Sequence, residues 1–234
     1  MDFLISPLGW KNWLVLISVL INLSMVVFIF SRGIKKNKIN LYFSLFTIST
    51  FLWGVSLLFG RTMIISQWQF WAYFAYIAAL AIALFLFYFT LHFPYQIKAL
   101  KTWQHLLVIL PAIFLSSIIY VKDYFIVKAI QDIANTEYVL WHNKFFYILY
   151  SIYFLIMVLF SLHFLWIKYK NSDGILKRGL FWLFVTILLG LIFGTYFDLI
   201  LCYFNNFHYI WVGQIFTLFI NLAVFYLIFF TKEK

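Results

Sequence analysis

The sequence predicts an all-α, polytopic membrane helix bundle with about seven transmembrane helices. Of its 234 residues, 66% are hydrophobic and only 10% are charged, whereas soluble domains are roughly 45–50% apolar and about 25% charged. The formal charge of +10 comes from cations clustered between long apolar runs, a pattern typical of membrane loops rather than of a nucleic-acid-binding face. We therefore expect a protein embedded in membrane lipid, with no nucleic-acid partner.

Seven apolar runs approach the roughly 20 residues that a helix needs to cross a bilayer. They do not alternate in polarity as the strands of a transmembrane β-barrel do, so helices are predicted. The seven runs make residues 1–234 a single transmembrane domain. The predicted spans are 13–30, 41–59, 68–91, 106–120, 145–167, 179–204 and 209–230.

The distribution of Lys and Arg predicts the orientation. Twelve of the 17 lie on the side that carries the C-terminus, and five lie on the other side. Because positive residues favour the cytoplasmic side, the N-terminus is predicted outside and the C-terminus in the cytoplasm. Arg32 and Lys35 follow the first span, where a signal peptide would have a small-residue cleavage site. A multi-pass protein of the cytoplasmic membrane is expected.

The connections between spans are too short for a kinase, cyclase or nucleotide-binding domain. The longest, residues 121–144, lies on the outer side, and its Tyr124, Tyr138 and Trp141 are expected to be interfacial anchors. The sequence has neither a Gly-x-Ser-x-Gly nor a His-Glu-x-x-His motif. We therefore expect no enzymatic activity and no catalytic residues.

No cofactor or metal is expected either. Cys202 is the single cysteine, and no histidine forms an i, i+4 pair with another ligand-type residue, so a metal site is not predicted. The last span also has no interior lysine that would hold a retinal.

Asp198 is the one carboxylate inside a predicted span. It lies six residues before Phe204, which places it about 9 Å from the outer end of the helix. An acid at such a depth is a candidate functional residue, and Arg61, His208 and Lys144 are candidate partners. Two interpretations stay open: a structural carboxylate near the interface, or a residue for sensing or ion binding.

Small and polar residues mark two further helix faces. Gly190 and Gly194 are four residues apart in the sixth span, which lets a second helix approach closely, either within the bundle or in a homodimer. Gln214, Thr217 and Asn221 share one face of the last span. They either hydrogen-bond to neighbouring helices or line a polar ligand cavity.

Several segments resemble the N-terminal seven-transmembrane region of bacterial histidine kinases and some diguanylate cyclases. These are Trp53-Gly54 in the second span, the His92-Phe93-Pro94 ending of the third, Lys177-Arg178 before the sixth, and Trp211-Val212-Gly213-Gln214 at the start of the last. The resemblance implies a module that perceives a signal and passes a conformational change to a cytoplasmic output domain. The chain ends four residues after the last span, so the output is expected on a separate protein.

Three functional hypotheses follow. The first is a sensory or regulatory module that acts on a separate cytoplasmic kinase or cyclase, with Asp198, Arg61, Gln214, Thr217 and Asn221 as ligand-binding or switch residues. The second is a small transporter, or a transporter subunit, that uses Asp198 as an ion or proton site. The third is a structural membrane subunit that binds no ligand.

Overall fold

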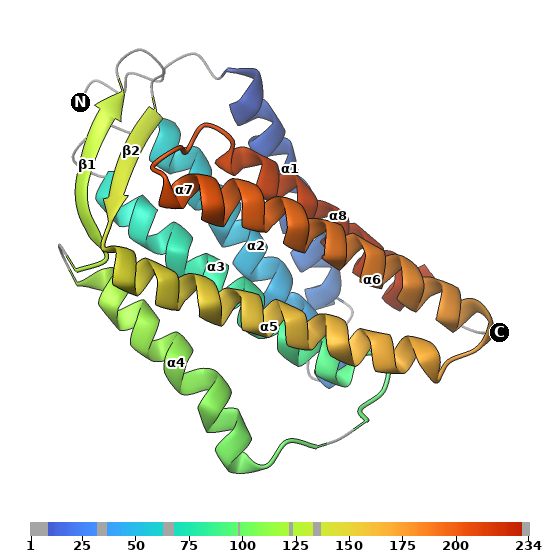
Figure 1. The fold of residues 1–234 in the computed structure, drawn as a ribbon. Coiled ribbons are helices and arrows are strands. Elements are labelled where there is room, and N and C mark those ends of the chain that lie inside the picture. The colour runs from blue at the N-terminus through green and yellow to red at the C-terminus, as the bar shows by residue number, and fades with distance from the viewer. Residues whose placement is uncertain are drawn as a thin grey trace.

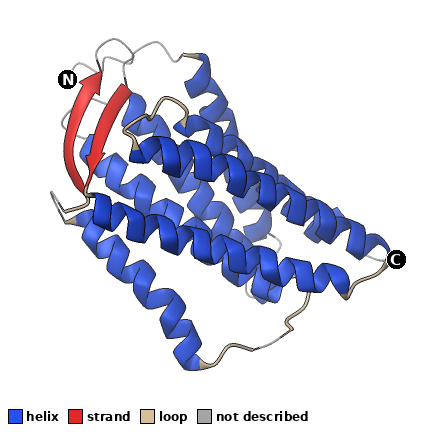
Figure 2. Cartoon of the chain, in the orientation of Figure 1, coloured by secondary structure: helices blue, strands red, loops and turns tan. Residues whose placement is uncertain are grey.

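The computed structural model describes residues 9–31, 37–62, 68–97, 99–121, 124–132 and 137–230, and Figure 1 shows its ribbon. Within these ranges, seven helical spans are long and apolar enough to cross a membrane. The chain is thus a multi-pass membrane protein built mainly from helices, as predicted (Figure 2). The helices are α1 Trp10–Ser31, α2 Lys38–Thr62, α3 Trp68–His92, α4 Thr102–Tyr120, α5 Lys144–Lys170, α6 Gly174–Gly194, α7 Leu201–Tyr203 and α8 Ile210–Phe230.

Most helices extend beyond the apolar runs that predicted them. Helix α4 begins at Thr102 rather than at residue 106, and α6 begins at Gly174 rather than at residue 179. At the starts of α4 and α5, polar side chains satisfy backbone groups that a helix leaves unpaired. The Gln104 side chain accepts a hydrogen bond from Lys101 N (2.9 Å), and the Asn143 side chain accepts one from Phe145 N (3.1 Å). Hydropathy marks the part of a helix inside the hydrocarbon layer, whereas capping sets its ends.

Six of the spans form a closed ring. Going round it, α1 contacts α2, α2 contacts α3, α3 contacts α5, α5 contacts α6, α6 contacts α8, and α8 returns to α1. Helix α4 stands outside the ring against α3 and α5, and it diverges from the bundle in Figure 1. The order of the helices around the ring therefore differs from their order in the chain, because α3 contacts α5 directly and α4 is not part of the ring.

A two-stranded antiparallel hairpin closes one end of the ring. Strands β1 Ile126–Asp132 and β2 Glu137–His142 pair within the connection from α4 to α5. The sequence analysis predicted a connection with interfacial anchors over residues 121–144, and it did not predict the strands. Tyr124 is exposed, and the side chain of Tyr138 lies outside the described residues. Trp141 is exposed as expected, but the neighbouring Leu140 is buried, as are Phe125 and Ile126. We call this end, which also carries the start of α1 (Figure 1), the hairpin end.

The sixth span changes its helical register near the hairpin end. A π-helical segment, η2 Thr195–Ile200, lies between α6 and α7. The chain then reverses through Asn205, which has a φ of 61°. Asn205 N donates to Cys202 O (3.0 Å), and Asn206 N donates to Leu201 O (2.9 Å). This pair of hydrogen bonds is a Schellman motif with Asn in the left-handed position, and it turns the chain into α8.

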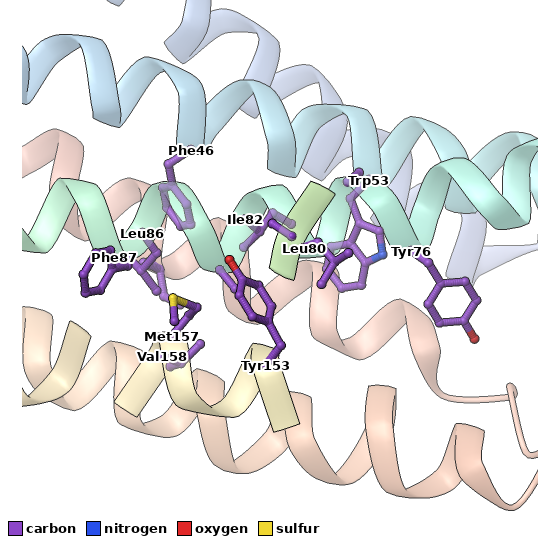
Figure 3. Packing of buried hydrophobic residues seen from close by; sticks show 14 of the residues in the cluster. Phe46, Trp53, Tyr76, Leu80, Ile82, Leu86, Phe87, Tyr153, Met157 and Val158 are labelled. Atoms are coloured by element: carbon purple, nitrogen blue, oxygen red, sulfur yellow. The ribbon is translucent and has the colours of Figure 1, made fainter. Parts of the chain in front are cut away.

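The core lies between α2, α3 and α5. Figure 3 shows Phe46 and Trp53 of α2 near Ile82 and Leu86 of α3, with side chains of α5 on the other side. Lipid tails are as apolar as these side chains, so close packing rather than removal from water holds the helices together. The same buried cluster continues to Phe125, Ile126 and Leu140 at the hairpin.

Candidate functional site

A cavity of about 160 Å³ lies inside the ring. Helices α2, α3, α5, α6 and α8 all contribute to its wall, together with η2, and Leu140 of β2 lines it at the hairpin end. The wall is mostly aromatic and aliphatic. Alanines of α3 leave the space open, among them Ala72, Ala75 and Ala79, and glycines of α6 and α8 also line it.

Asp198 lies on the π-helical segment and lines the cavity. Single π-helical turns within α-helices frequently occur at functional sites. Side chains satisfy three consecutive carbonyl groups here. The Tyr147 hydroxyl donates to Asp198 O (3.2 Å) and Leu199 O (3.0 Å), and Cys202 Sγ donates to Phe197 O (3.7 Å). Tyr147 of α5 is thus a positioning residue for the segment that carries the acid.

The carboxylate of Asp198 packs against the backbone of α8. A Cβ atom added at Gly213 would collide with Asp198 Oδ2, and one added at Gly194 would lie 3.7 Å from the same atom. Glycine at position 213 therefore makes room for the acid. Asp198 Oδ1 is buried and accepts no hydrogen bond from the described residues, an arrangement that costs about 1–3 kcal/mol for a buried polar atom.

None of the three candidate partners donates a hydrogen bond to this oxygen. Arg61 lines the same cavity as Asp198. His208 instead lies 2.9 Å from Lys11 Nζ, measured to Nε2, and Lys144 Nζ lies 5.7 Å from the centre of the Tyr203 ring. The structure brings Arg61 and Asp198 to one cavity, and it places His208 and Lys144 elsewhere at the hairpin end.

An aromatic cluster connects the hairpin to the cavity. Tyr76 Oη lies 2.7 Å from His142 Nε2, and the His142 ring is 4.6 Å from the ring of Tyr147. Burial lowers the pKa of His142 to about 3, because these surroundings disfavour a charged imidazole ring. The last residue of the hairpin is therefore a neutral hydrogen-bonding group that contacts both α3 and the positioning residue Tyr147.

The predicted polar face of the last span serves two different regions. Thr217 lines the cavity, but its hydroxyl donates to Gln214 O in its own helix (2.9 Å). Gln214 and Asn221 are fully buried toward α1 and α2. Asn221 Nδ2 donates to Asn22 Oδ1 (2.8 Å) and to Thr50 Oγ1 (2.7 Å).

Gln214 completes this second polar cluster. Its Nε2 donates to Ser18 Oγ (3.2 Å), so α8 is hydrogen-bonded to α1 at two levels. These α1 residues are absent from the sequence-based candidates, although Ser18 and Asn22 are polar, four residues apart and inside an apolar span. That spacing is a signal for a buried face.

Gly190 and Gly194 lie on the inner side of α6. A Cβ atom at Gly190 would lie 2.9 Å from Ile220 Cδ1, so this glycine lets α6 approach α8. Gly194 lies next to the Asp198 carboxylate instead. Both residues line the cavity, so their close approach is to groups within the bundle.

Lys168 has a role that no sequence pattern indicated. It is fully buried, and its ammonium group donates to Thr90 O (2.6 Å), Leu91 O (3.0 Å) and Phe93 O (2.7 Å). Carbonyl groups at the end of a helix have no partner within the helix. Lys168 of α5 therefore caps α3 at the end of the bundle opposite the hairpin.

Within the part of the chain that the structure describes, no three His, Cys, Asp or Glu side chains are grouped closely enough to hold a metal ion. Comparisons of the chain with protein-family models, with curated proteins and with solved structures found no match. The cavity with Asp198 is the feature of the described residues that best fits a ligand site.

Proposed function

We propose that this protein is a sensory module of the cytoplasmic membrane, in which a small ligand in the central cavity alters a separate cytoplasmic partner. The observation that carries the proposal is Asp198 Oδ1, a buried oxygen that accepts no hydrogen bond from the part of the chain that the structure describes and that lies in a mostly apolar cavity. Its π-helical segment adds support, since such segments are frequent at functional sites. The resemblance to the input regions of histidine kinases suggests a kinase or a cyclase as the partner.

The proposed orientation places the hairpin end outside the cell. It follows from the excess of Lys and Arg on the opposite side of the spans. In this orientation Asp198 and the cavity lie nearer the outer surface, and the α5–α6 connection faces the cytoplasm. A ligand would bind in the outer half of the bundle, and the cytoplasmic partner would respond to the resulting change at the inner end.

The packing of α6 on α8 offers a route between the two ends. Gly190 lets α6 approach Ile220 near the cavity, and a Cβ atom at Gly179 would collide with Leu227 Cδ2 nearer the opposite end. Such close packing transmits a small shift as a rigid displacement of the helix. Ligand binding would change the relative populations of two arrangements of α6 against α8.

The experiment is to tag the C-terminus, purify the protein from its native membranes in mild detergent, and identify the proteins that accompany it. We expect a kinase or cyclase whose activity changes when the two are reconstituted. Asp198→Asn should alter this regulation, whereas Ser117→Ala, at an exposed hydroxyl of α4 outside the ring, should not. Recovery of the protein without such a partner from several detergents would contradict the proposal.

One observation favours a transporter as a second candidate. The sixth span is interrupted by the π-helical segment at the position of its carboxylate, and interrupted membrane helices often form ion sites in transporters. In this case Asp198 would be the ion or proton site. Solute uptake into proteoliposomes that is lost in Asp198→Asn would support this function, and no uptake across a broad panel of solutes would contradict it.

A further inference from the structure

We infer that the ligand of the central cavity is a small apolar alcohol whose hydroxyl group lies between Asp198 and Tyr150. The inference rests on the proposed function, because it assigns a chemical class to the ligand of the same cavity. Three properties of the cavity lead to it: its size, the chemistry of its wall, and the polar groups in that wall that have no partner.

The size of the cavity limits the ligand to a few non-hydrogen atoms. Its volume is about 160 Å³, close to an engineered protein cavity of roughly 150 Å³ that binds benzene. A single ring, or a branched aliphatic group of similar size, fits this space.

The wall favours an uncharged, apolar body. Side chains such as Trp71, Ile82, Phe154, Ile187 and Phe216 line the cavity. An ion in such surroundings loses its hydration, which costs several kcal/mol unless it is paired and hydrogen-bonded. A neutral molecule that dissolves in the bilayer pays no such penalty and reaches the bundle through the lipid.

Most polar groups in the wall are already satisfied. Ser56 Oγ donates to Leu52 O (2.7 Å), and the Thr217 hydroxyl also donates to a carbonyl of its own helix. The Tyr76 hydroxyl lies beside His142. These groups therefore have little need of a ligand.

Two groups in the wall carry the inference, and the indole groups of Trp53 and Trp71 and the guanidinium group of Arg61 line it as well. Asp198 Oδ1 is buried and needs a donor. Tyr150 lines the same cavity and is only 2% exposed, and its hydroxyl is not engaged by the described residues. A carboxylate oxygen accepts, and a phenol both donates and accepts. A hydroxyl can donate to Asp198 and accept from Tyr150, whereas an ether cannot donate to the carboxylate. An ammonium could donate to both groups, but it would enter the apolar wall as an ion and lose its hydration.

The test measures binding of four tritiated probes of nearly equal size to the protein in lipid nanodiscs. The probes are benzyl alcohol, its isomer anisole, toluene and benzylamine. Empty nanodiscs give the correction for partition into lipid. We expect benzyl alcohol to bind about three- to tenfold more tightly than anisole, as one net hydrogen bond predicts, and more tightly than toluene or benzylamine.

Variants locate the binding and identify the polar contacts. Ala79→Leu fills the cavity and should abolish binding of every probe, whereas Ala81→Leu, in a separate groove between α3 and α4, should leave binding unchanged. Asp198→Leu should remove the preference for benzyl alcohol over anisole, and Tyr150→Phe should reduce it. If Asp198→Leu does not fold, the preference for benzyl alcohol over anisole in Tyr150→Phe is the deciding measurement.

The outcomes separate the two proposals. Equal binding of benzyl alcohol and anisole, or tighter binding of benzylamine, would overturn the alcohol class. If these probes were still sensitive to Ala79→Leu, the cavity would stand as the ligand site. No binding of any probe that depends on Ala79 would overturn the cavity as a ligand site, and with it the proposed function.

Discussion

At the scale of single residues, Asp198 depends on a glycine in another helix. Gly213 of α8 leaves the space that the carboxylate occupies, and Tyr147 of α5 holds the π-helical carbonyls from the other side. The acid is therefore positioned by three spans. Substitutions at its neighbours are expected to affect it as strongly as substitutions of the acid itself.

Gly213→Ala should displace the Asp198 carboxylate, because the new methyl group would occupy the same space. Overpacking of this kind costs about 1–3 kcal/mol, so we expect a lower thermal unfolding midpoint. Gly60→Ala is the matched control, since a Cβ atom there would lie 3.7 Å from Trp71 Cβ, an ordinary contact. An equal effect of the two substitutions would show that the carboxylate is not held against α8.

His142 makes stability depend on pH at the hairpin end. Its pKa in the folded protein is lowered to about 3 by burial, whereas in the unfolded chain it has the ordinary value of about 6.5. Between these values the unfolded chain binds one more proton than the folded protein, so the free energy of unfolding falls as pH falls through this window.

The measurement compares thermal unfolding midpoints at pH 7.5 and pH 5.0. We expect the wild-type midpoint to be lower at pH 5.0, and the difference to shrink in His142→Asn, which cannot take up the proton. The same pH dependence in both proteins would assign the effect to other groups.

At the scale of elements, two buried polar contacts hold the ring together at different heights. Asn22 of α1 accepts a hydrogen bond from Asn221 of α8 in the interior, and Lys168 of α5 caps α3 at the end opposite the hairpin. Each contact joins helices that are distant in sequence. Such contacts specify neighbours within a bundle because a buried polar group without its partner is costly.

Lys168→Met should destabilise the contact between α3 and α5. The methionine keeps a long apolar side chain but removes the ammonium that donates to three carbonyl groups. Hydrogen bonds from charged groups are worth about 1.5–3 kcal/mol each before the desolvation of the ammonium is counted, so we expect a net loss of about 2 kcal/mol in denaturant unfolding.

Lys170→Met is the control for this substitution. Lys170 is exposed at the same helix end and lies 5.2 Å from the centre of the Trp166 ring, a contact worth less than about 1 kcal/mol at an exposed site. A Lys168→Met protein as stable as Lys170→Met would mean that the cap of α3 contributes nothing measurable.

At the scale of the whole molecule, the ring and its charges set the proposed orientation. Tyr124 is exposed at the hairpin end, and Asn171 is exposed in the α5–α6 connection at the opposite end. We expect a membrane-impermeant maleimide to label Tyr124→Cys in intact cells, and Asn171→Cys only after the membrane is opened. The native Cys202 is buried and should not react. Labelling of Asn171→Cys in intact cells would reverse the orientation.

The order of helices around the ring was not predictable from the sequence. Hydropathy located all seven spans to within a few residues, but it carried no sign that α3 contacts α5 while α4 lies outside. The hairpin was not predicted for a related reason. Its strands are short, and Leu140 is buried only because the hairpin packs on the helix bundle.

The candidate site was predictable only in part. Asp198 was identified because an acid inside an apolar span is unusual, and Gly190 and Gly194 because small residues recur at helical spacing. Gln214 and Asn221 were grouped with them, but they face α1. Tyr150 and Tyr147 could not be distinguished from the other tyrosines, since their roles depend on what faces them across the cavity.

The sequence by itself determined that the chain is embedded in lipid. It also determined where the spans lie and which side of them carries more positive charge. These properties follow from composition and length, because the bilayer has a set thickness and requires helical backbone. Only the tertiary structure decided which faces meet, and so which polar groups share the cavity. In lipid, an apolar side chain is equally suited to the bundle interior and to its surface, so hydropathy does not mark the inner face of a helix. The inner face is marked instead by shape complementarity at residues such as Gly213 and Gly190.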